Sequence, residues 1–268
     1  MIIGENFFIT EFEKTGTTFL RNYFRNYKNV KITAHHDFIN YKNQNLELLK
    51  KRYRITTVRN PFSWYVSLWK WSCKNNRISP LYKNLTKSRI KISRLKFKLL
   101  TINYLIRQLL KNKKKWENLF IDPNSTDNFN IWIKEFLNTD NKLEIGSDYS
   151  YTVGNDIGYM TYQFLIRNSI STNLNALYSR LKYNKNTISE LLDKNFTNFV
   201  IKTENLNTSL IEILPKLNLK SLHLTATNRI EADNKDYEYL DFISPENKNL
   251  IYKKEFFLFK NYYPEFKF

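Results

Sequence analysis

Residues 7–20 read FFITEFEKTGTTFL, and this stretch decides the expected fold. Residues 6–10 form a short apolar segment, as is typical of a strand buried in a parallel sheet. Residues 17–27 place large apolar side chains at helical spacing, so a helix is expected there. Between strand and helix lies a polar turn. Such a turn is a natural site for a phosphate or sulfate group, because free N–H groups and the helix dipole both face the anion.

The residues of this turn suit an anion. Gly16 would let the backbone approach the ligand closely, and Lys14 supplies a mobile positive charge. Thr17 and Thr18 add hydroxyl donors. The nucleotide-binding pattern GxxxxGK[ST] is absent, which disfavours a kinase or an ATPase. A plain strand–helix turn with a capping threonine explains these residues equally well when they are taken alone.

A second segment, residues 53–61, reads YRITTVRNP and repeats the arrangement. Arg59 follows a predicted strand at 54–58, at the end where α/β sheets tend to bind ligands. Pro61 is placed to begin a helix, and Ser67 lies two turns into it. Taken alone, Arg59 and Ser67 fit a surface arginine and a solvated serine. Two anion sites on neighbouring strands predict a ligand with two separated anionic groups.

The rest of the chain alternates strands and helices, which indicates an α/β fold with a central parallel sheet flanked by helices. We expect a single domain over residues 1–268, with a basic helical insertion at 74–126. The other expected elements are strands at 30–33 and 197–202, and helices at 46–52, 129–136, 206–214 and 245–260.

The composition is strongly basic. The formal net charge is +18, from 43 Lys+Arg and 25 Asp+Glu, which predicts attraction to nucleic acid, an anionic membrane or an acidic polysaccharide. Residues 83–115 carry many basic residues and no acidic one. This stretch could hold an acidic polysaccharide or contact an anionic membrane, and a solvated helix face is the plain alternative.

The sequence also bears on location and cofactors. No apolar run is long enough to span a membrane, and we expect no signal peptide, because the N-terminal residues lead directly into a predicted strand. The single cysteine, Cys73, excludes an intramolecular disulfide and a cysteine-based zinc site. We therefore expect a cytoplasmic protein, with peripheral membrane contact through 83–115 as an option.

Together the two segments resemble the sulfotransferases that use 3′-phosphoadenosine 5′-phosphosulfate (PAPS). In that family a Lys-x-Gly-Thr-Thr loop holds the 5′-phosphosulfate, and an Arg-(Asn/Asp)-Pro segment with a later serine holds the 3′-phosphate. The resemblance implies a P-loop-like sheet. The matching residues are Lys14, Thr15, Gly16, Thr17 and Thr18 in the first segment, and Arg59, Asn60, Pro61 and Ser67 in the second.

Weaker similarities extend along the chain. Phe129-x-x-Trp132 and residues 200–206 resemble later family segments, and the end of the chain at 252–268 resembles the carbohydrate branch. Arg229 is the candidate for a late basic loop that contacts the 3′-phosphate in relatives.

A sulfotransferase needs a group that accepts the proton of the acceptor hydroxyl. His35 and His36 directly follow the predicted strand at 30–33, at the edge of both anion sites if the strands are parallel. Histidine has an ordinary pKa of about 6.5, so it can accept a proton near neutral pH. In carbohydrate sulfotransferases a histidine upstream of the arginine resembles His36. His35, Glu11 and Glu13 stay open as alternatives, and so does a purely structural turn histidine.

The resemblance implies transfer of a sulfuryl group from PAPS to an acceptor hydroxyl on a carbohydrate, which leaves adenosine 3′,5′-bisphosphate. Lys14 and the amides of 16–18 would stabilise the developing charge, and His36 would act as base. No metal is expected, because a sulfuryl group carries less charge than a phosphoryl group. The alternatives are a nucleic-acid-binding module on the basic stretch and a P-loop-like small-molecule kinase. Neither of them accounts for both anion loops.

Overall fold

A computed structural model of the chain describes residues 1–11, 13–33, 51–88, 99–145, 149, 157–168, 197–220 and 238–266. The chain divides into two compact units. Unit 1 holds Met1–Asn60, Gln163–Leu174 and Glu190–Glu238, and unit 2 holds Pro61–Tyr162, Asn175–Ser189 and Tyr239–Phe268. The described helices of the segment 74–126 belong to unit 2. A single domain over 1–268 stays a prediction.

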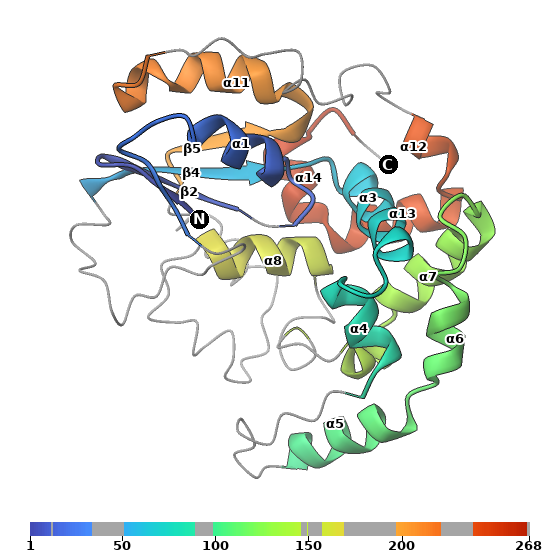
Figure 1. The fold of residues 1–268 in the computed structure, drawn as a ribbon. Helices are drawn as coiled ribbons and strands as arrows, with labels where there is room; N and C mark the ends of the chain where they lie inside the picture. Colours follow the sequence, from blue (N-terminus) through green and yellow to red (C-terminus); the bar gives the residue numbers. More distant parts are fainter. Residues whose placement is uncertain are drawn as a thin grey trace. The chain divides into compact units, whose positions relative to one another are not determined.

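Unit 1 is built on a five-stranded mixed sheet with the strand order β3-β1-β2-β4-β5 (Figure 1). In this sheet β2, β4 and β5 are parallel, with Thr10 opposite Thr56 and Val58 opposite Lys202. β1 is antiparallel to both β2 and β3, so β3 runs in the same direction as β2. The strands are β1 (Ile2–Ile3), β2 (Phe7–Thr10), β3 (Lys31–Ile32), β4 (Tyr53–Val58) and β5 (Phe199–Lys202).

The expectation of a wholly parallel sheet is corrected by β1. Ile3 pairs with Phe8 across a tight connection in which the Gly4 N–H donates to the Phe7 carbonyl at 3.0 Å. A link this short can only join antiparallel strands, because a parallel pair needs a crossover of about a dozen residues or more. The sheet is therefore parallel at β2, β4 and β5 and antiparallel at β1. The sequence pattern missed β1 because two residues are too few to show alternation.

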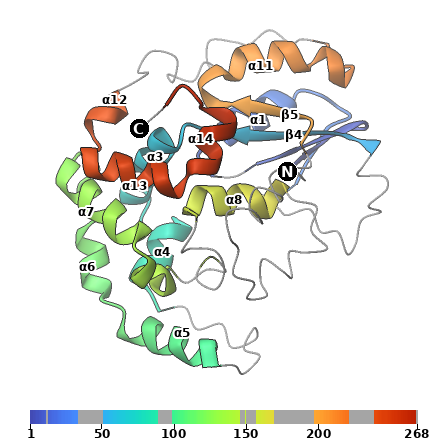
Figure 2. The same ribbon diagram turned by 180° about the vertical axis from the view of Figure 1, so that it is seen from behind.

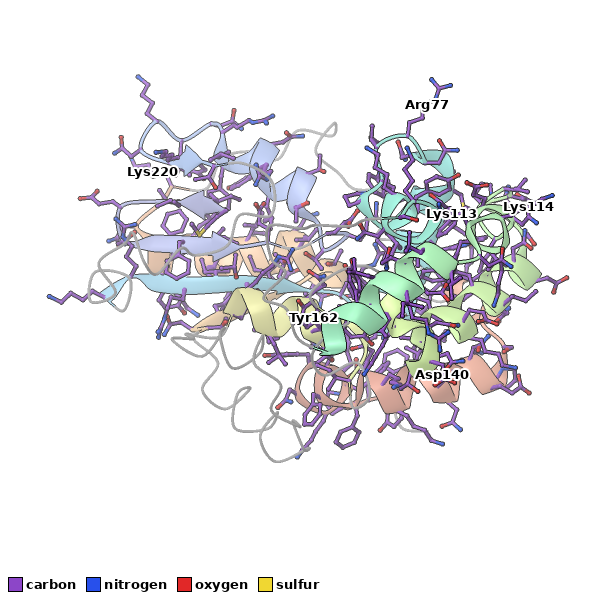
Figure 3. The ribbon with its side chains drawn as sticks, turned by 90° about the horizontal axis from the view of Figure 1, so that it is seen from below. Arg77, Lys113, Lys114, Asp140, Tyr162 and Lys220 are labelled. Atoms are coloured by element: carbon purple, nitrogen blue, oxygen red, sulfur yellow. The ribbon has the colours of Figure 1, made fainter. Side chains whose placement is uncertain are left out.

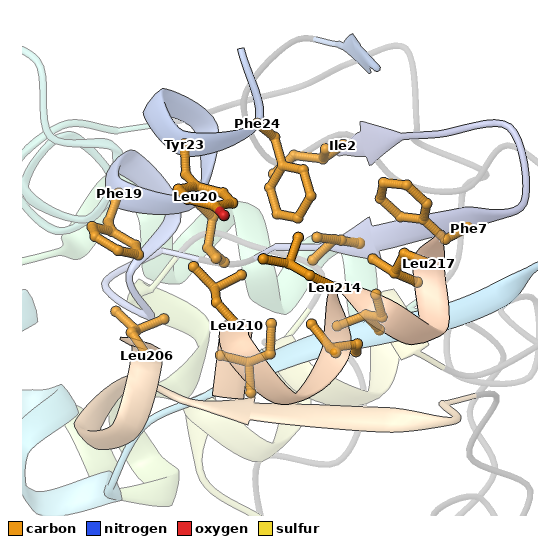
Figure 4. Packing of buried hydrophobic residues seen from close by; sticks show 14 residues of the cluster. Ile2, Phe7, Phe19, Leu20, Tyr23, Phe24, Leu206, Leu210, Leu214 and Leu217 are labelled. Atoms are coloured by element: carbon orange, nitrogen blue, oxygen red, sulfur yellow. The ribbon is translucent and has the colours of Figure 1, made fainter. Parts of the chain in front are cut away.

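One face of this sheet is covered by α1 (Thr17–Phe24) and α11 (Leu206–Ile213), which confirms the helices expected in these two places. Figure 4 shows their packing against the strands. Burial of each large apolar side chain contributes about 1.5–3 kcal/mol, so this cluster holds α1 firmly on the sheet. The buried members from the two helices include Phe19, Leu20, Tyr23, Phe24, Leu206 and Leu210, and those from the strands are Ile2, Phe7, Ile9, Ile55 and Ile201.

The other face of the sheet receives the end of α8 (Tyr159–Asn168), of which the residues from Gln163 onward belong to unit 1. The Thr10 hydroxyl donates to Asn168 Oδ1 at 2.6 Å. Figures 1 and 2 both draw α8 on the side of the strands away from α1 and α11. The last residues of α8 therefore lie beside the end of β2.

Unit 2 is helical and has an aromatic core. Trp132 stacks on Phe136 with 4.9 Å between ring centroids, and Trp69 packs edge-on against Phe129. None of the helices that the structure describes combines the length and the apolar character needed to cross a bilayer. The main helices are α3 (Pro61–Lys74), α4 (Pro80–Thr86), α5 (Leu99–Leu110), α6 (Lys113–Asn118), α7 (Thr126–Leu137), α13 (Pro245–Lys254) and α14 (Phe256–Tyr262), with the 3₁₀ helix η2 (Thr139–Glu144).

The expectation of one helix over 245–260 was wrong, because the helix breaks at Glu255 between α13 and α14. The break turns the Glu255 side chain into the interior of unit 2. There its carboxylate accepts hydrogen bonds from the Met160 N–H at 3.0 Å, the Thr161 N–H at 2.8 Å and the Tyr65 hydroxyl. The first amides of a helix have no partner within the helix, so this buried carboxylate caps α8.

Candidate functional site

The loop between β2 and α1 has the backbone shape expected of an anion site. Two of its residues are left-handed, Lys14 with φ 65° and Gly16 with φ 79°. Gly16 is the N-cap of α1, and its position provides no side chain to accept from the first amides of the helix. Left-handed turns before a helix N-terminus present backbone N–H groups to an anion. Thr17 is buried and Thr18 is exposed at the start of the helix.

Glycine is required at position 16 for two independent reasons. A positive φ is strained for any residue with a Cβ atom. A Cβ atom added here would also lie 2.7 Å from Leu206 Cδ1, at the start of α11. Leu206 itself is buried in the core of unit 1. The shape of the loop therefore depends on Leu206, at the start of α11, as well as on the loop's own sequence.

The first loop is joined directly to β4 and to the segment after it. The Thr15 and Thr57 hydroxyl oxygens lie 2.5 Å apart and share a buried hydrogen bond. Arg59 Nη1 donates to the Lys14 carbonyl oxygen at 3.4 Å. The two segments that the sequence singled out, at 14–18 and at 59–60, therefore meet at the carboxyl-terminal edge of the parallel strands.

The segment after β5 holds the second loop in place. The Thr203 hydroxyl donates to the Val58 carbonyl at 2.8 Å, and the Asn60 N–H donates to Glu204 Oε1 at 2.7 Å. The residue pattern around Glu204 resembles a segment of the sulfotransferase family but does not predict these contacts. The sequence feature that could have indicated these contacts is the polar pair Thr203-Glu204 directly after the strand β5, because parallel strands end at the same edge of the sheet.

The surroundings of Lys14 at this edge disfavour its protonated form. Burial lowers the pKa of Lys14, the neighbouring Arg59 guanidinium lowers it further, and Glu13 acts against both. Burial raises the pKa of the Glu13 carboxyl, while Lys14 and Arg167 oppose that rise. Lys14 and Arg59 repel one another near the start of the helix, and an anionic ligand bound there would offset this repulsion.

Glu11 is held in a buried ion pair beside this loop. Its carboxylate accepts from Arg21 Nε at 3.0 Å and from Arg21 Nη2 at 2.6 Å, and the Met1 amino group lies 3.1 Å away. Arg21 Nη1 also donates to the Thr33 carbonyl at 2.9 Å. The Glu11 carboxylate is buried and occupied by these two partners, so it does not face an incoming hydroxyl group, and Glu13 is the better glutamate alternative.

Several predicted residues cannot be placed at this edge. Ser67 lies half-buried on α3, in unit 2, and its part in the same site stays a prediction. β3 runs in the direction of β2 toward this edge, and Thr33 is the last described residue before the segment 34–50. The candidate histidines and the late arginine lie outside the described residues: His35 and His36 in 34–50, and Arg229 in 221–237.

Comparison of the chain with models of protein families, with curated proteins and with solved structures finds no match.

Proposed function

We propose that the chain is a PAPS-dependent sulfotransferase with a P-loop-like site, acting on a hydroxyl group of a carbohydrate. The observation that carries this proposal is the meeting of the two loops, with the Arg59 guanidinium on the Lys14 carbonyl. The uncapped start of α1 and the left-handed Gly16 suit the phosphosulfate end of the donor. Arg59, directly after the neighbouring strand β4, suits a second phosphate.

In the proposed reaction the acceptor oxygen forms a bond to sulfur while the bond from sulfur to the bridging phosphate oxygen breaks. Lys14 and the backbone amides of 16–18 stabilise the negative charge that grows on that bridging oxygen. His36 accepts the proton of the acceptor hydroxyl, with His35 and Glu13 as the alternatives. Arg59 and Ser67 hold the 3′-phosphate and select against nucleotides that lack it.

The binding half of the proposal is tested with adenosine 3′,5′-bisphosphate in isothermal titration calorimetry. We expect binding that exceeds that of adenosine 5′-phosphate and of magnesium ATP. Arg59→Ala should weaken it about 10- to 100-fold, as loss of a charge-assisted hydrogen bond does. The control is Arg25→Ala, which removes an exposed arginine of unit 1 whose guanidinium donates to the nearby Asn22 side chain. Equal affinity for all three nucleotides would refute the 3′-phosphate site, and a preference for magnesium ATP would favour a kinase.

The chemical half is tested by turnover with labelled PAPS and a panel of glycans. Lys14→Ala should lower turnover about 100- to 1,000-fold, the usual effect of removing one group that stabilises a developing anion. Lys31→Ala, an exposed lysine on β3, is the matched control. His36→Ala and His35→Ala then separate the two candidate bases. Near-normal turnover by Lys14→Ala would remove that lysine from the mechanism.

A further inference from the structure

The outer face of α5 in unit 2 has the reverse of the usual polarity. Polar side chains of its last turns point inward, where Gln108 is fully buried and Lys111, just past the helix, is 5% exposed. Apolar side chains point outward, with Ile106 at 46%, Leu109 at 63% and Leu110 at 76% exposure. Tyr104 is also buried on α5, so its inward side is mixed, whereas three exposed aliphatic side chains gather on its outward side, as is typical of an interaction surface.

The inward polar groups fix this orientation. Gln108 Nε2 donates to the Leu143 carbonyl at 2.6 Å, in η2, and the Ser88 hydroxyl donates to the Gln108 carbonyl at 2.8 Å. Lys111 Nζ donates to the Asn84 carbonyl at 2.7 Å, near the end of α4. Rotation of α5 to hide its leucines would break these bonds and leave the buried carbonyl groups that accept them without these donors. The apolar stripe is therefore held outward, and Figures 1 and 2 both draw α5 at the outer edge of unit 2.

Cations flank the stripe. Arg107 is exposed on α5, and Lys113 and Lys114 are exposed at the start of α6, where Figure 3 labels them together. No acidic residue occurs in the sequence between Glu47 and Glu117. The exposed acidic side chains on the elements next to α5 are Glu117, in the α6 helix that also carries Lys113 and Lys114, and Asp140, which Lys142 accompanies in η2.

We propose that this outer face, formed by Ile106, Leu109, Leu110 and the flanking Arg107, Lys113 and Lys114, docks on a lipid bilayer that exposes anionic headgroups. Aliphatic side chains would enter the boundary of headgroups and acyl chains, while the cations bind the headgroup phosphates and carboxylates. A nucleic acid or an acidic polysaccharide would use the cations and leave the leucines in water. A second copy packed symmetrically on the same face would set like charges against each other. The inference does not depend on the proposed sulfotransferase activity.

The test is co-sedimentation of the whole protein with phosphatidylcholine vesicles that contain or lack phosphatidylserine, in a series of salt concentrations. We expect binding only to the vesicles with phosphatidylserine. The double variant Leu109→Ser/Leu110→Ser should weaken that binding about tenfold or more, since two aliphatic side chains no longer enter the bilayer. The control is Ile211→Ser, which removes an equally exposed aliphatic side chain from α11 in unit 1.

A pair of charge variants completes the test. Lys113→Glu/Lys114→Glu should abolish vesicle binding, whereas Lys28→Glu/Lys220→Glu changes the net charge equally but at exposed positions of unit 1 and should bind. Circular dichroism melts establish that all variants fold. The proposal is overturned if the wild-type protein ignores anionic vesicles, or if the serine variant binds them as well as the wild type. It is equally overturned if the face proves to hold two copies together, shown by dimers that the serine variant dissociates.

Discussion

Replacement of Gly16 by alanine measures how strongly the first loop depends on one residue. A side chain at φ 79° costs about 1–2 kcal/mol, because the Cβ atom approaches the following carbonyl in the left-handed region. The new Cβ atom would also lie 2.7 Å from Leu206 Cδ1, and overpacking of a buried site typically costs about 1–3 kcal/mol. The sum is roughly 2–5 kcal/mol, which lowers the Tm of a domain of this size by at least about 5 °C.

The assay must report on unit 1. All five tryptophans, at positions 64, 69, 71, 116 and 132, lie in unit 2, so tryptophan fluorescence would follow the wrong part of the chain. Urea unfolding followed by far-ultraviolet circular dichroism reports on the secondary structure of both units and is the appropriate measurement.

A double-mutant cycle with Leu206→Ala separates the two contributions. Leu206→Ala alone should cost about 2–5 kcal/mol, as a buried leucine does. In the double variant the alanine at position 16 no longer meets the leucine, so only the backbone strain remains from that substitution. The double variant should therefore be about 1–3 kcal/mol more stable than the sum of the single variants predicts. Additive costs would refute the contact, and a Gly16→Ala protein as stable as the wild type would refute the backbone argument as well.

Two further substitutions test the buried carboxylates. Burial raises the pKa of Glu255 above its ordinary 4.5, against the hydrogen bonds it accepts, so the folded state holds the proton more tightly than the unfolded chain and stability falls as the pH rises above 4.5. Glu255→Gln should remove this part of the pH dependence, and thermal melts from about pH 4 to pH 8 that keep the wild-type slope would contradict it. Arg21→Met leaves the buried Glu11 carboxylate without its guanidinium partner and should cost about 3–5 kcal/mol. A loss below about 1 kcal/mol in this variant, measured by urea unfolding, would show that the ion pair contributes little to the stability of unit 1.

The local pattern of the sequence was sufficient for the centre of the fold. The apolar run of β2, the helical spacing of Phe19, Leu20 and Tyr23, and the glycine between them are all short-range features. Each of them restricts the backbone where it stands, so strand, loop and helix could be located from the sequence alone. The meeting of the first loop with Arg59 followed from one further step, because parallel neighbouring strands end at the same edge.

Long-range contacts account for what the sequence did not indicate. The break at Glu255 exists because its carboxylate caps a helix that begins about a hundred residues earlier, at a turn containing Met160 and Thr161. The reversed polarity of α5 depends on carbonyl groups of α4 and η2 that a helical wheel does not show. The residue pattern predicted a basic helix there, and only the packing shows which of its faces is apolar and outward.

The segment after β5 explains how the two loops can act as one site. β4 lies between β2 and β5, so a chain leaving β5 at the carboxyl-terminal edge can reach the ends of both other strands. It does so within four residues: Thr203 bonds to Val58, Glu204 to Asn60, and Leu206 packs over Gly16. A displacement of this segment would therefore move both loops together. The spacing between Lys14 and Arg59 is set by their direct hydrogen bond and also by residues of this segment, which touch neither end of the ligand in the proposed reaction.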